Sequence, residues 1–331
     1  MRAFQVEKHG QPLHEARAPE PTAGEHDVLV QVAAASLNHL DEKLRTGEFR
    51  LIAPTPMPLT LGHDLAGTVV EVGSQVQAFR PGDLVFARPR DGRVGTFAER
   101  IAVHADDVAL APASVGPVEA ASLPLVALTA WQALVERADV QPGQKVLVHA
   151  GAGGVGTVAV QLAKHLGAHV ATTVSADGAD FVRDLGADVV VDHRTQRFEE
   201  VLSGYDVVVD GLGPESVARS LRVLRPGGRV IGLQGPPDPA FARAAGLGPV
   251  VRLAIAGLSR SVRRQAAARG VSYEFLWMRA DGEQLRRIAE LVDTGAVRPV
   301  VGATHPFDDT AEALASLGRT RIRGKAVVVL P

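Results

Sequence analysis

The chain has 331 residues, of which 46% are hydrophobic and 22% charged, and its formal net charge is −2. This is the composition of a globular protein with room for about two domains. The absence of cysteine excludes disulfide scaffolds, cysteine nucleophiles, thiolate zinc sites and iron–sulfur clusters. The near-neutral charge gives no reason to expect a nucleic-acid partner.

The N-terminal segment Met1–Gly10 alternates apolar and polar residues and lacks the apolar run of a secretory signal. A charge-free apolar stretch of about 18 residues occurs nowhere in the chain, so we expect no membrane-spanning helix. We therefore expect a cytoplasmic enzyme.

Short alternating apolar runs, cut by Gly and Pro, fill residues 1–124. They predict strands over Val28–Ala34, Leu65–Val72 and Asp83–Ala87. This first segment therefore reads as an irregular, mostly β domain.

Residues 125–278 alternate short apolar runs with helical patterns, which predicts an α/β domain with a doubly wound parallel sheet. The run Lys145–Ala150 reads as a strand buried on both faces, and a helix follows over Val155–Leu166. Further strands are expected over His169–Val174, Asp188–Val191, Asp206–Asp210, Arg229–Leu233 and Ser272–Trp277. Helices are expected near Asp180–Leu185 and Ser216–Leu224, and Pro226-Gly227-Gly228 is expected to break the chain before Arg229.

An arginine-rich segment, residues 241–273, holds six arginines and no acidic residue. Within it, Val250–Ala266 reads as a helix with an apolar stripe of Leu253, Ala254, Gly257, Leu258 and Val262. The segment is a solvated helical face, an amphipathic helix near a cleft, a dimer surface or a membrane-surface patch.

The pattern changes again in the tail, residues 279–331. It predicts an amphipathic helix over Gly282–Thr294, with Leu285, Ile288, Ala289 and Val292 on one face, and a strand over Ala326–Leu330. We expect this tail to pack onto the N-terminal β domain.

A glycine loop follows the strand that begins at Lys145 and opens the next helix. Its glycines 151, 153 and 156 fit the pattern G-x-G-x-x-G in the context that makes this pattern informative. Glycine lets a pyrophosphate approach the backbone, and the helix start attracts the anion. The alternative is an ordinary glycine turn. We expect a nucleotide on Gly151, Ala152, Gly153, Gly154, Val155 and Gly156.

The end of the second strand predicts which nicotinamide cofactor is bound. An NAD site usually has an acidic residue there, but none lies between Ala168 and Ala176. Thr173 and Ser175 occupy the expected place, and Arg194, after the third strand, can pair with a 2′-phosphate or be a solvated arginine. Asp177 argues the other way. The balance favours NADPH over NADH.

Several motifs resemble the medium-chain dehydrogenase/reductase superfamily, in that family's order and over about residues 1–330. They are AASLNHLD at 34–41, GHDLAGTVVEVG at 62–73, PGDLVFA at 81–87, GTFAER at 95–100, AGAGGVG at 150–156, LRPGG at 224–228 and RGKAV at 323–327. The resemblance implies a GroES-like catalytic domain, residues 1–124 and 279–331, with a Rossmann domain, residues 125–278, inserted into it.

The zinc alcohol dehydrogenases of this superfamily hold their catalytic metal with Cys, His and Cys. The matching positions here are Asn38, His63 and Leu125, so one ligand of three remains, and the structural zinc loop is missing. His39, Asp41 and Asp64 are near in sequence, but neither their spacing nor their ligand types fit a zinc site. We expect no metal.

The chain is more similar to the zinc-less quinone oxidoreductase branch, in Asn38 within S-x-N-x-x-D and in Arg323-Gly324-Lys325. Members of that branch transfer a hydride from NADPH to quinones or to the C=C bond of α,β-unsaturated carbonyls, and the likeness implies a homodimer. Such a reduction places negative charge on an oxygen, so the site needs hydrogen-bond donors there, while the cofactor supplies the hydride.

The catalytic candidates are Asn38, Asp41 and His63. Asn38 is the first candidate donor to the substrate oxygen, or it caps a loop. Asp41 orients Asn38 or caps a helix expected to begin near Glu42. His63 is a hydrogen-bonding pocket histidine or a satisfied buried one. Phe49 stands where related enoyl-thioester reductases have a tyrosine, which suits a flat apolar substrate.

The remaining cofactor candidates come from the ends of strands and from the family motifs. Gly211, Leu233 and Gln234 follow strand ends at the carboxyl edge of the sheet, where the nicotinamide ring should lie. Thr129, at the start of the Rossmann domain, is expected at the nicotinamide ribose. Lys325 either reaches the cofactor or is a strand-edge lysine.

The sequence therefore predicts a zinc-independent NADPH oxidoreductase acting on quinones or α,β-unsaturated carbonyls. Two alternatives stay open. One is a metal-dependent alcohol dehydrogenase. The other is an NADPH-binding protein with a non-catalytic role, crystallin-like or RNA-binding, for which the arginine-rich segment is the only suitable feature.

Overall fold

A computed structural model describes residues 1–50 and 55–331. The chain divides into two compact units. Unit 1 contains Met1–Leu128 and Arg279–Pro331, and unit 2 contains Thr129–Met278. The sequence alone places the divisions at 124/125 and 278/279.

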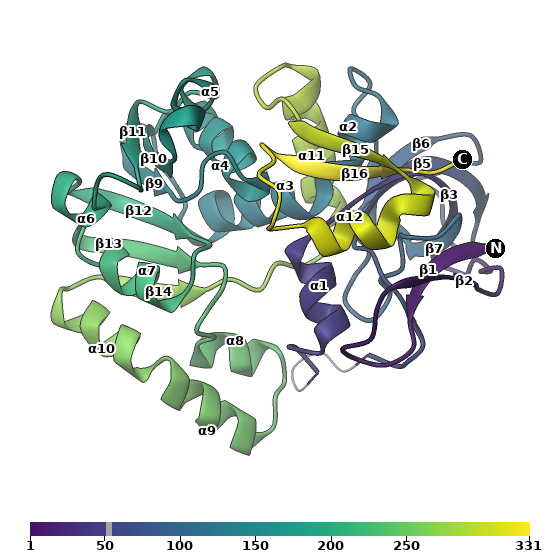
Figure 1. Ribbon diagram of the computed structural model, residues 1–331, viewed down its shortest axis with the longest axis horizontal. Coiled ribbons are helices and arrows are strands. Elements are labelled where there is room, and N and C mark those ends of the chain that lie inside the picture. Colours follow the sequence, from purple (N-terminus) through teal and green to yellow (C-terminus); the bar gives the residue numbers. More distant parts are fainter. Residues whose placement is uncertain (51–54) are drawn as a thin grey trace. The chain divides into compact units, whose positions relative to one another are not determined.

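Unit 1 is built on two sheets (Figure 1). The larger, seven-stranded sheet has the order β15-β16-β3-β5-β6-β8, with β7 also paired to β3, and the smaller has the order β2-β1-β4. The strands are β1 Arg2–Val6, β2 His14–Arg17, β3 Asp27–Ser36, β4 Leu59–Thr60, β5 Asp64–Val72, β6 Leu84–Ala87, β7 Arg100–His104, β8 Val108–Leu110, β15 Val301–Pro306 and β16 Lys325–Val329.

The chain's tail is an integral part of unit 1. Strand β16 pairs antiparallel with β3, with Val327 opposite Ser36 and Val329 opposite Ala34. The helices of this part are α1 His39–Thr46, α2 Pro117–Ala121, α3 Pro124–Trp131, which continues into unit 2, α11 Gly282–Asp293 and α12 Thr310–Ser316. The predicted apolar face of α11 is buried at all four positions, because it packs against the sheet of unit 1.

Unit 2 is a six-stranded parallel sheet with the order β11-β10-β9-β12-β13-β14. This doubly wound arrangement confirms the predicted fold class. The strands are β9 Lys145–Val148, β10 His169–Val174, β11 Val189–Asp192, β12 Tyr205–Asp210, β13 Leu224–Gly232 and β14 Ser272–Phe275. The helices are α4 Gly154–His165, α5 Ala179–Asp184, α6 Phe198–Val201, α7 Pro214–Ser220, α8 Pro239–Ala244, α9 Pro249–Leu258 and α10 Arg260–Ala268.

Two predicted element boundaries are wrong. Helix α1 begins at His39 and not near Glu42, because Asn38 is its N-cap and the Asp41 carboxylate accepts a hydrogen bond from the Asn38 N–H. Strand β13 already begins at Leu224, so α7 ends four residues earlier than expected. The Pro-Gly-Gly sequence lies within β13 and does not end a structural element there. It coincides with a shift in the register between β13 and β12.

The single helix expected over Val250–Ala266 is also wrong, because α9 ends at Leu258 and α10 starts afresh at Arg260. The predicted apolar stripe divides accordingly: Val262 is buried, whereas Leu253 and Leu258 are exposed. No helix in the described ranges is long and apolar enough to cross a membrane.

Candidate functional site

The glycine loop of unit 2 joins β9 to α4 and requires glycine at two positions. A Cβ on Gly151 would lie 2.1 Å from Thr172 Oγ1, and a Cβ on Gly156 would lie 2.2 Å from the Ala150 carbonyl oxygen. Gly153 is the extended N-cap of α4. The loop therefore leads into the start of α4 with no side chain at Gly151, Gly153 or Gly156. This leaves the backbone accessible to a pyrophosphate.

Thr173 lies beneath this loop. Its Oγ1 accepts a hydrogen bond from the Ala150 N–H at 3.1 Å and lies 3.1 Å from His149 Nδ1, and its carbonyl oxygen accepts from the Gly151 N–H. The side chain is buried. The Thr173 hydroxyl therefore supports the backbone of the loop, and its expected contact with the cofactor stays a prediction.

His149 is a buried residue that the sequence reasoning missed. Its Nε2 lies 3.0 Å from Ser220 Oγ, which donates to Asp210 Oδ2 at 2.8 Å, and its ring packs edge-on against Phe198. Burial lowers the pKa of His149. The only signal in the sequence was a polar residue within an apolar run, which periodicity does not explain.

The other cofactor candidates of unit 2 lie at the carboxyl ends of strands, except Thr129, which is buried in α3. Ser175 follows β10 and Arg194 follows β11, which are adjacent strands. Arg194 is exposed, and its backbone N–H donates to Asp192. Gly211 and Leu233 follow the adjacent strands β12 and β13. The distance from the Cβ position of Gly211 to Leu233 Cδ1 is 3.7 Å. Gln234, the next residue after Leu233, is exposed.

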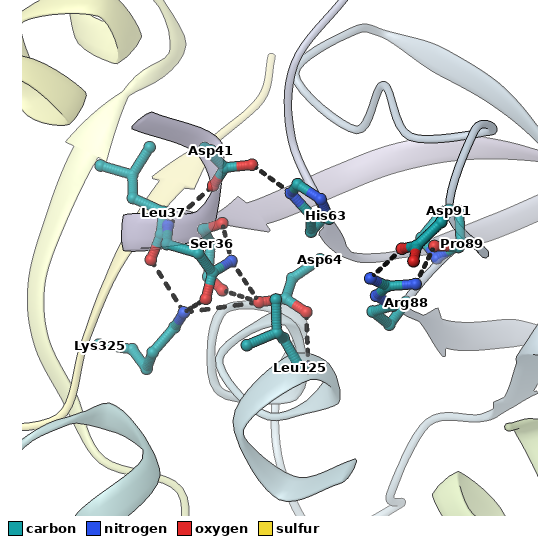
Figure 2. Close-up of polar contacts among 11 residues, drawn as sticks. Ser36, Leu37, Asp41, His63, Asp64, Arg88, Pro89, Asp91, Leu125 and Lys325 are labelled. Carbon is teal, nitrogen blue, oxygen red and sulfur yellow. Dashed lines mark hydrogen bonds and ion pairs between the residues drawn. The ribbon is translucent and has the colours of Figure 1, made fainter. Parts of the chain in front are cut away.

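Unit 1 contains a buried polar cluster, which we define as Ser36, Asn38, Asp41, His63, Asp64 and Lys325 (Figure 2). Its members come from the end of β3, the start of α1, the start of β5 and the start of β16. The antiparallel pairing of β3 with both β5 and β16 brings these strand ends together.

Asp64 is the central acceptor of the polar cluster and is fully buried. Its Oδ2 accepts hydrogen bonds from Ser36 Oγ at 2.7 Å and from Asn38 Nδ2 at 2.9 Å. Its Oδ1 accepts from the Leu125 N–H at 2.7 Å. Both carboxylate oxygens are thus satisfied inside the protein, as a buried charge requires.

Lys325 is the buried cation that accompanies Asp64. Its Nζ donates to the Leu37 carbonyl oxygen at 2.8 Å and to Asn38 Oδ1, and lies 3.5 Å from Asp64 Oδ2. Burial lowers the pKa of Lys325, while the charges of Asp64 and Asp41 oppose that shift. The expectation of a strand-edge lysine is wrong, since the side chain is 6% exposed and anchored in the polar cluster.

Asn38 has no amide hydrogen left for a substrate. Its Nδ2 donates to Asp64 and, at 3.2 Å, to the Ser36 carbonyl oxygen, while Oδ1 accepts from Lys325. The assignment of Oδ1 and Nδ2 follows from the lysine, which can only donate. Asn38 therefore holds the polar cluster together, which corrects its expected role as the donor to a substrate oxygen.

Asp41 and His63 form a buried carboxylate–imidazole pair. Asp41 Oδ1 lies 2.5 Å from His63 Nδ1, and Asp41 Oδ2 accepts from the Asn38 N–H at 2.8 Å. A carboxylate here fixes Nδ1 as the protonated nitrogen. Within the described part of the chain, His63 Nε2 has no hydrogen-bond partner, so this nitrogen is available to an external group.

Two further residues of unit 1, Phe49 and Arg88, lie outside the polar cluster as defined above. Phe49 is half-buried in the turn after α1, and Lys43 Nζ lies 5.5 Å from its ring centroid. Arg88 follows β6 and is 1% exposed; its Nη1 donates to the Pro89 carbonyl oxygen and its Nη2 pairs with Asp91 (Figure 2). Among the residues that the structure describes, its Nε has no hydrogen-bond partner. Sequence reasoning missed Arg88, because a charged turn normally lies at the surface.

The polar cluster does not fit a catalytic zinc ion. Of the three corresponding positions, only His63 has a ligand side chain to offer, because Leu125 has no donor side chain and the amide of Asn38 is fully engaged. The ammonium of Lys325, beside these positions, lies against both Asn38 and Asp64. No group of three or more His, Cys, Asp or Glu residues that could hold a metal occurs in residues 1–50 and 55–331. One imidazole cannot form the ligand set that zinc requires.

Comparisons with known proteins agree with this architecture. Residues 24–113 match the family described as alcohol dehydrogenase GroES-like domain, and residues 185–328 match the family described as zinc-binding dehydrogenase. The chain is 34% identical to mouse NAD(P)H oxidoreductase RTN4IP1, mitochondrial, over 92% of this chain and 81% of that protein. It is 33% identical to the 2-methylene-furan-3-one reductase of Solanum lycopersicum, over 95% of this chain and 74% of that protein.

Among solved structures, the quinone oxidoreductase from Coxiella burnetii superposes with a TM-score of 0.85 at 28% identity, covering 100% of this chain and 99% of that one. Together with the two sheets, the glycine loop and a polar cluster that lacks a zinc ligand set, these matches show the family. The chain belongs to the medium-chain dehydrogenase/reductase superfamily, in the zinc-less branch of the quinone and enone oxidoreductases.

Proposed function

We propose that this protein is an NADPH-dependent oxidoreductase that reduces quinones or the C=C bond of α,β-unsaturated carbonyls. Relatives named as a 2-methylene-furan-3-one reductase and as an NADPH-dependent alkenal/one oxidoreductase support the substrate class. The observation that carries the proposal is the buried Asp41–His63 pair with its available Nε2, in a polar cluster that cannot hold zinc.

Unit 2 supplies the cofactor site. The glycine loop from Gly151 to Gly156 would hold the pyrophosphate, because a Cβ at Gly151 or Gly156 would collide with Thr172 or with the loop itself. Ser175 and Arg194, at adjacent strand ends without an acidic residue in β10, would receive the 2′-phosphate. Bound NADPH supplies the hydride.

Unit 1 supplies the proton. When the β-carbon of an enone or a quinone gains a hydride, negative charge develops on the conjugated oxygen, so a donor aimed at that oxygen lowers the barrier. In the doubly protonated ring His63 donates from Nε2, while Asp41 holds the other nitrogen, Nδ1, in place. The proton moves from Nε2 to the substrate, and the imidazole regains one from solvent.

Asn38, Asp64 and Lys325 act through this pair. The Asn38 N–H fixes Asp41, while the Asn38 side chain is held by Asp64 and Lys325. They are positioning residues, because none of them offers a free donor to a substrate. The polar cluster thus holds one proton donor, His63, in a fixed orientation.

The experiment measures oxidation of NADPH and NADH against 1,4-quinones and enones by the wild type and by His63→Gln. We expect turnover with NADPH and a kcat about 10²–10⁴-fold lower in the variant, the range for loss of a general acid, with unchanged NADPH affinity. His14→Gln, whose side chain is 46% exposed on β2, is the matched control and should behave as wild type. Equal turnover by His63→Gln would contradict the proposed role.

Two other results would point to the rival functions. Stoichiometric zinc with chelator-sensitive activity would indicate an alcohol dehydrogenase. NADPH binding without turnover across the whole panel would indicate a non-catalytic nucleotide-binding protein. In Asn38→Ala we expect a smaller loss than in His63→Gln, because Asn38 only positions Asp41.

The compartment and the oligomeric state stay predictions. We expect a cytoplasmic homodimer. The names of several relatives state another compartment, the mitochondrion or the chloroplast. Size-exclusion chromatography with light scattering tests the homodimer directly.

A further inference from the structure

Unit 2 carries three helices, α8, α9 and α10, between β13 and β14 (Figure 1). One face of α9 and α10 is buried: Ile255 is 4% exposed, Val262 6% and Ala266 2%, and the last two belong to the core that includes Tyr273. These inward residues explain how the helices attach to the sheet, but they leave the outward residues unexplained.

The outer face of α9 is apolar and exposed. Val250, Leu253 and Leu258 are 80%, 76% and 66% exposed, the three most exposed large apolar side chains in the described part of the chain. Single exposed apolar side chains are ordinary on protein surfaces, but three within nine residues form an apolar patch of the kind found at interaction sites.

The outer face of α10 is basic. Arg260 and Arg264 are exposed, and neither side chain has a hydrogen-bond or ion-pair partner within the described residues. Arg263 differs, since its Nη2 donates to the Ala256 carbonyl oxygen at 2.9 Å and its Nε to Ser259 Oγ at 3.2 Å, which fixes the junction of the two helices. Two guanidinium groups therefore remain uncompensated in a segment without any acidic residue.

The apolar and basic halves meet in one groove. It measures about 550 Å³ and is lined by Leu253 and Gly257 from α9 and by Arg260, Arg264 and Ala267 from α10. An occupant must therefore offer an apolar part beside an anionic part. We name Val250, Leu253, Leu258, Arg260 and Arg264 the α9–α10 outer face.

We propose that the α9–α10 outer face docks onto a bilayer that contains anionic phospholipid. Amphipathic helices bind such surfaces by burying the apolar side at the acyl boundary while arginines pair with phosphates. The charge excludes the main rivals. A second copy in a two-fold contact would bring the same acid-free segment, with no carboxylate of its own to pair with these arginines. A nucleic acid would leave the leucines in water, with no aromatic residue from 242 to 272 for base stacking.

The test is co-sedimentation of the full-length protein with vesicles of phosphatidylglycerol and phosphatidylcholine, compared with pure phosphatidylcholine. We expect binding to the anionic vesicles that weakens as salt is added, because salt screens exposed charges. Binding to pure phosphatidylcholine should be far weaker, since the apolar patch alone is small.

Two variants and one control separate this surface from general stickiness. Arg260→Gln with Arg264→Gln should lower partition about 25-fold, at about fivefold for each arginine, and Leu253→Ser with Leu258→Ser should lower it at least as much. Arg183→Gln with Val201→Ser changes an arginine whose side chain is 56% exposed and a valine that is 53% exposed on α5 and α6, and should leave partition unchanged.

Unchanged circular dichroism and NADPH affinity would establish that each variant is folded. The proposal is overturned if wild-type protein ignores anionic vesicles, or if both outer-face variants bind them as wild type does. It is also overturned if the variants halve the mass measured by light scattering, since a second copy would then cover this face. None of these results depends on the substrate of the enzyme.

Discussion

The glycine loop of unit 2 and the polar cluster of unit 1 represent opposite ways of building a site. The loop lies within six consecutive residues, and its chemistry comes from the backbone and from missing Cβ atoms. The cluster joins Lys325 to Leu37 across 288 positions of sequence, and its chemistry comes from side chains whose charges must balance in a dry interior. The loop keeps its shape only while no side chain fills it, whereas the polar cluster is stable only while its buried charges neutralise one another.

The largest effect is expected from breaking that balance. Lys325→Met leaves Asp64 buried without its cation, which should destabilise unit 1 by about 3–5 kcal/mol. Hydrogen exchange of the β3 and β16 amides measures this loss locally. The double variant Asp64→Asn with Lys325→Met removes both charges and should recover part of it; a double variant that is less stable than the single one would refute the charge argument.

The loop is broken by volume and not by charge. In Gly156→Ala the new Cβ meets the Ala150 carbonyl oxygen, so we expect NADPH to bind about 10–100-fold more weakly, from an overpacking strain of about 1–3 kcal/mol. Fluorescence titration gives the affinity. Gly257→Ala is the control, since no atom of the described residues lies within 4 Å of its Cβ position, and it should bind NADPH normally.

An ion pair between α6 and α7 of unit 2 allows a test by pH. The Arg219 guanidinium, hydrogen-bonded to Glu199 at 2.8 Å through two nitrogens, lowers the pKa of Glu199 from 4.5 to about 2. Glu199→Gln should therefore destabilise unit 2 by about 1–3 kcal/mol at pH 7. Because the folded pKa is depressed, this stabilisation is complete above pH 4.5 and is lost as the pH falls towards 2.

Urea unfolding followed by tryptophan fluorescence reports on this unit, since Trp277 lies in it and Trp131 is also one of its residues. The difference between wild type and Glu199→Gln should shrink between pH 5 and pH 3. Glu200→Gln, at a neighbouring position that is 59% exposed, should cost less than about 0.5 kcal/mol at either pH. A constant difference for Glu199 would show that packing, and not charge, explains it.

The smallest effect concerns cofactor choice. Arg194 is exposed, so its contact with a 2′-phosphate is screened, and Arg194→Gln should reduce the preference for NADPH over NADH about five- to tenfold, about 1 kcal/mol. The ratio of kcat/KM for the two cofactors measures it. An unaltered ratio would leave Ser175 as the remaining determinant.

The same contrast explains what the sequence could predict. The glycine loop, strand β10 and the buried face of α11 follow from local pattern, since each is encoded in a short window. The roles of Asn38 and Lys325 could not be predicted, because they depend on how many protons of each group are already engaged by partners far away in sequence. The two-helix break at Ser259 was also missed, since the apolar stripe continues through it.

The position of β16 has a consequence for biosynthesis. This strand, which brings Lys325 to Asp64, is made only after all of unit 2 has left the peptidyl-transferase centre. A nascent chain can fold its nucleotide-binding unit first, whereas the earlier-synthesised β3 and β5 must wait with an exposed edge and an unneutralised aspartate. Order of translation and order of completion are therefore reversed: the half of the molecule that is made first is finished last.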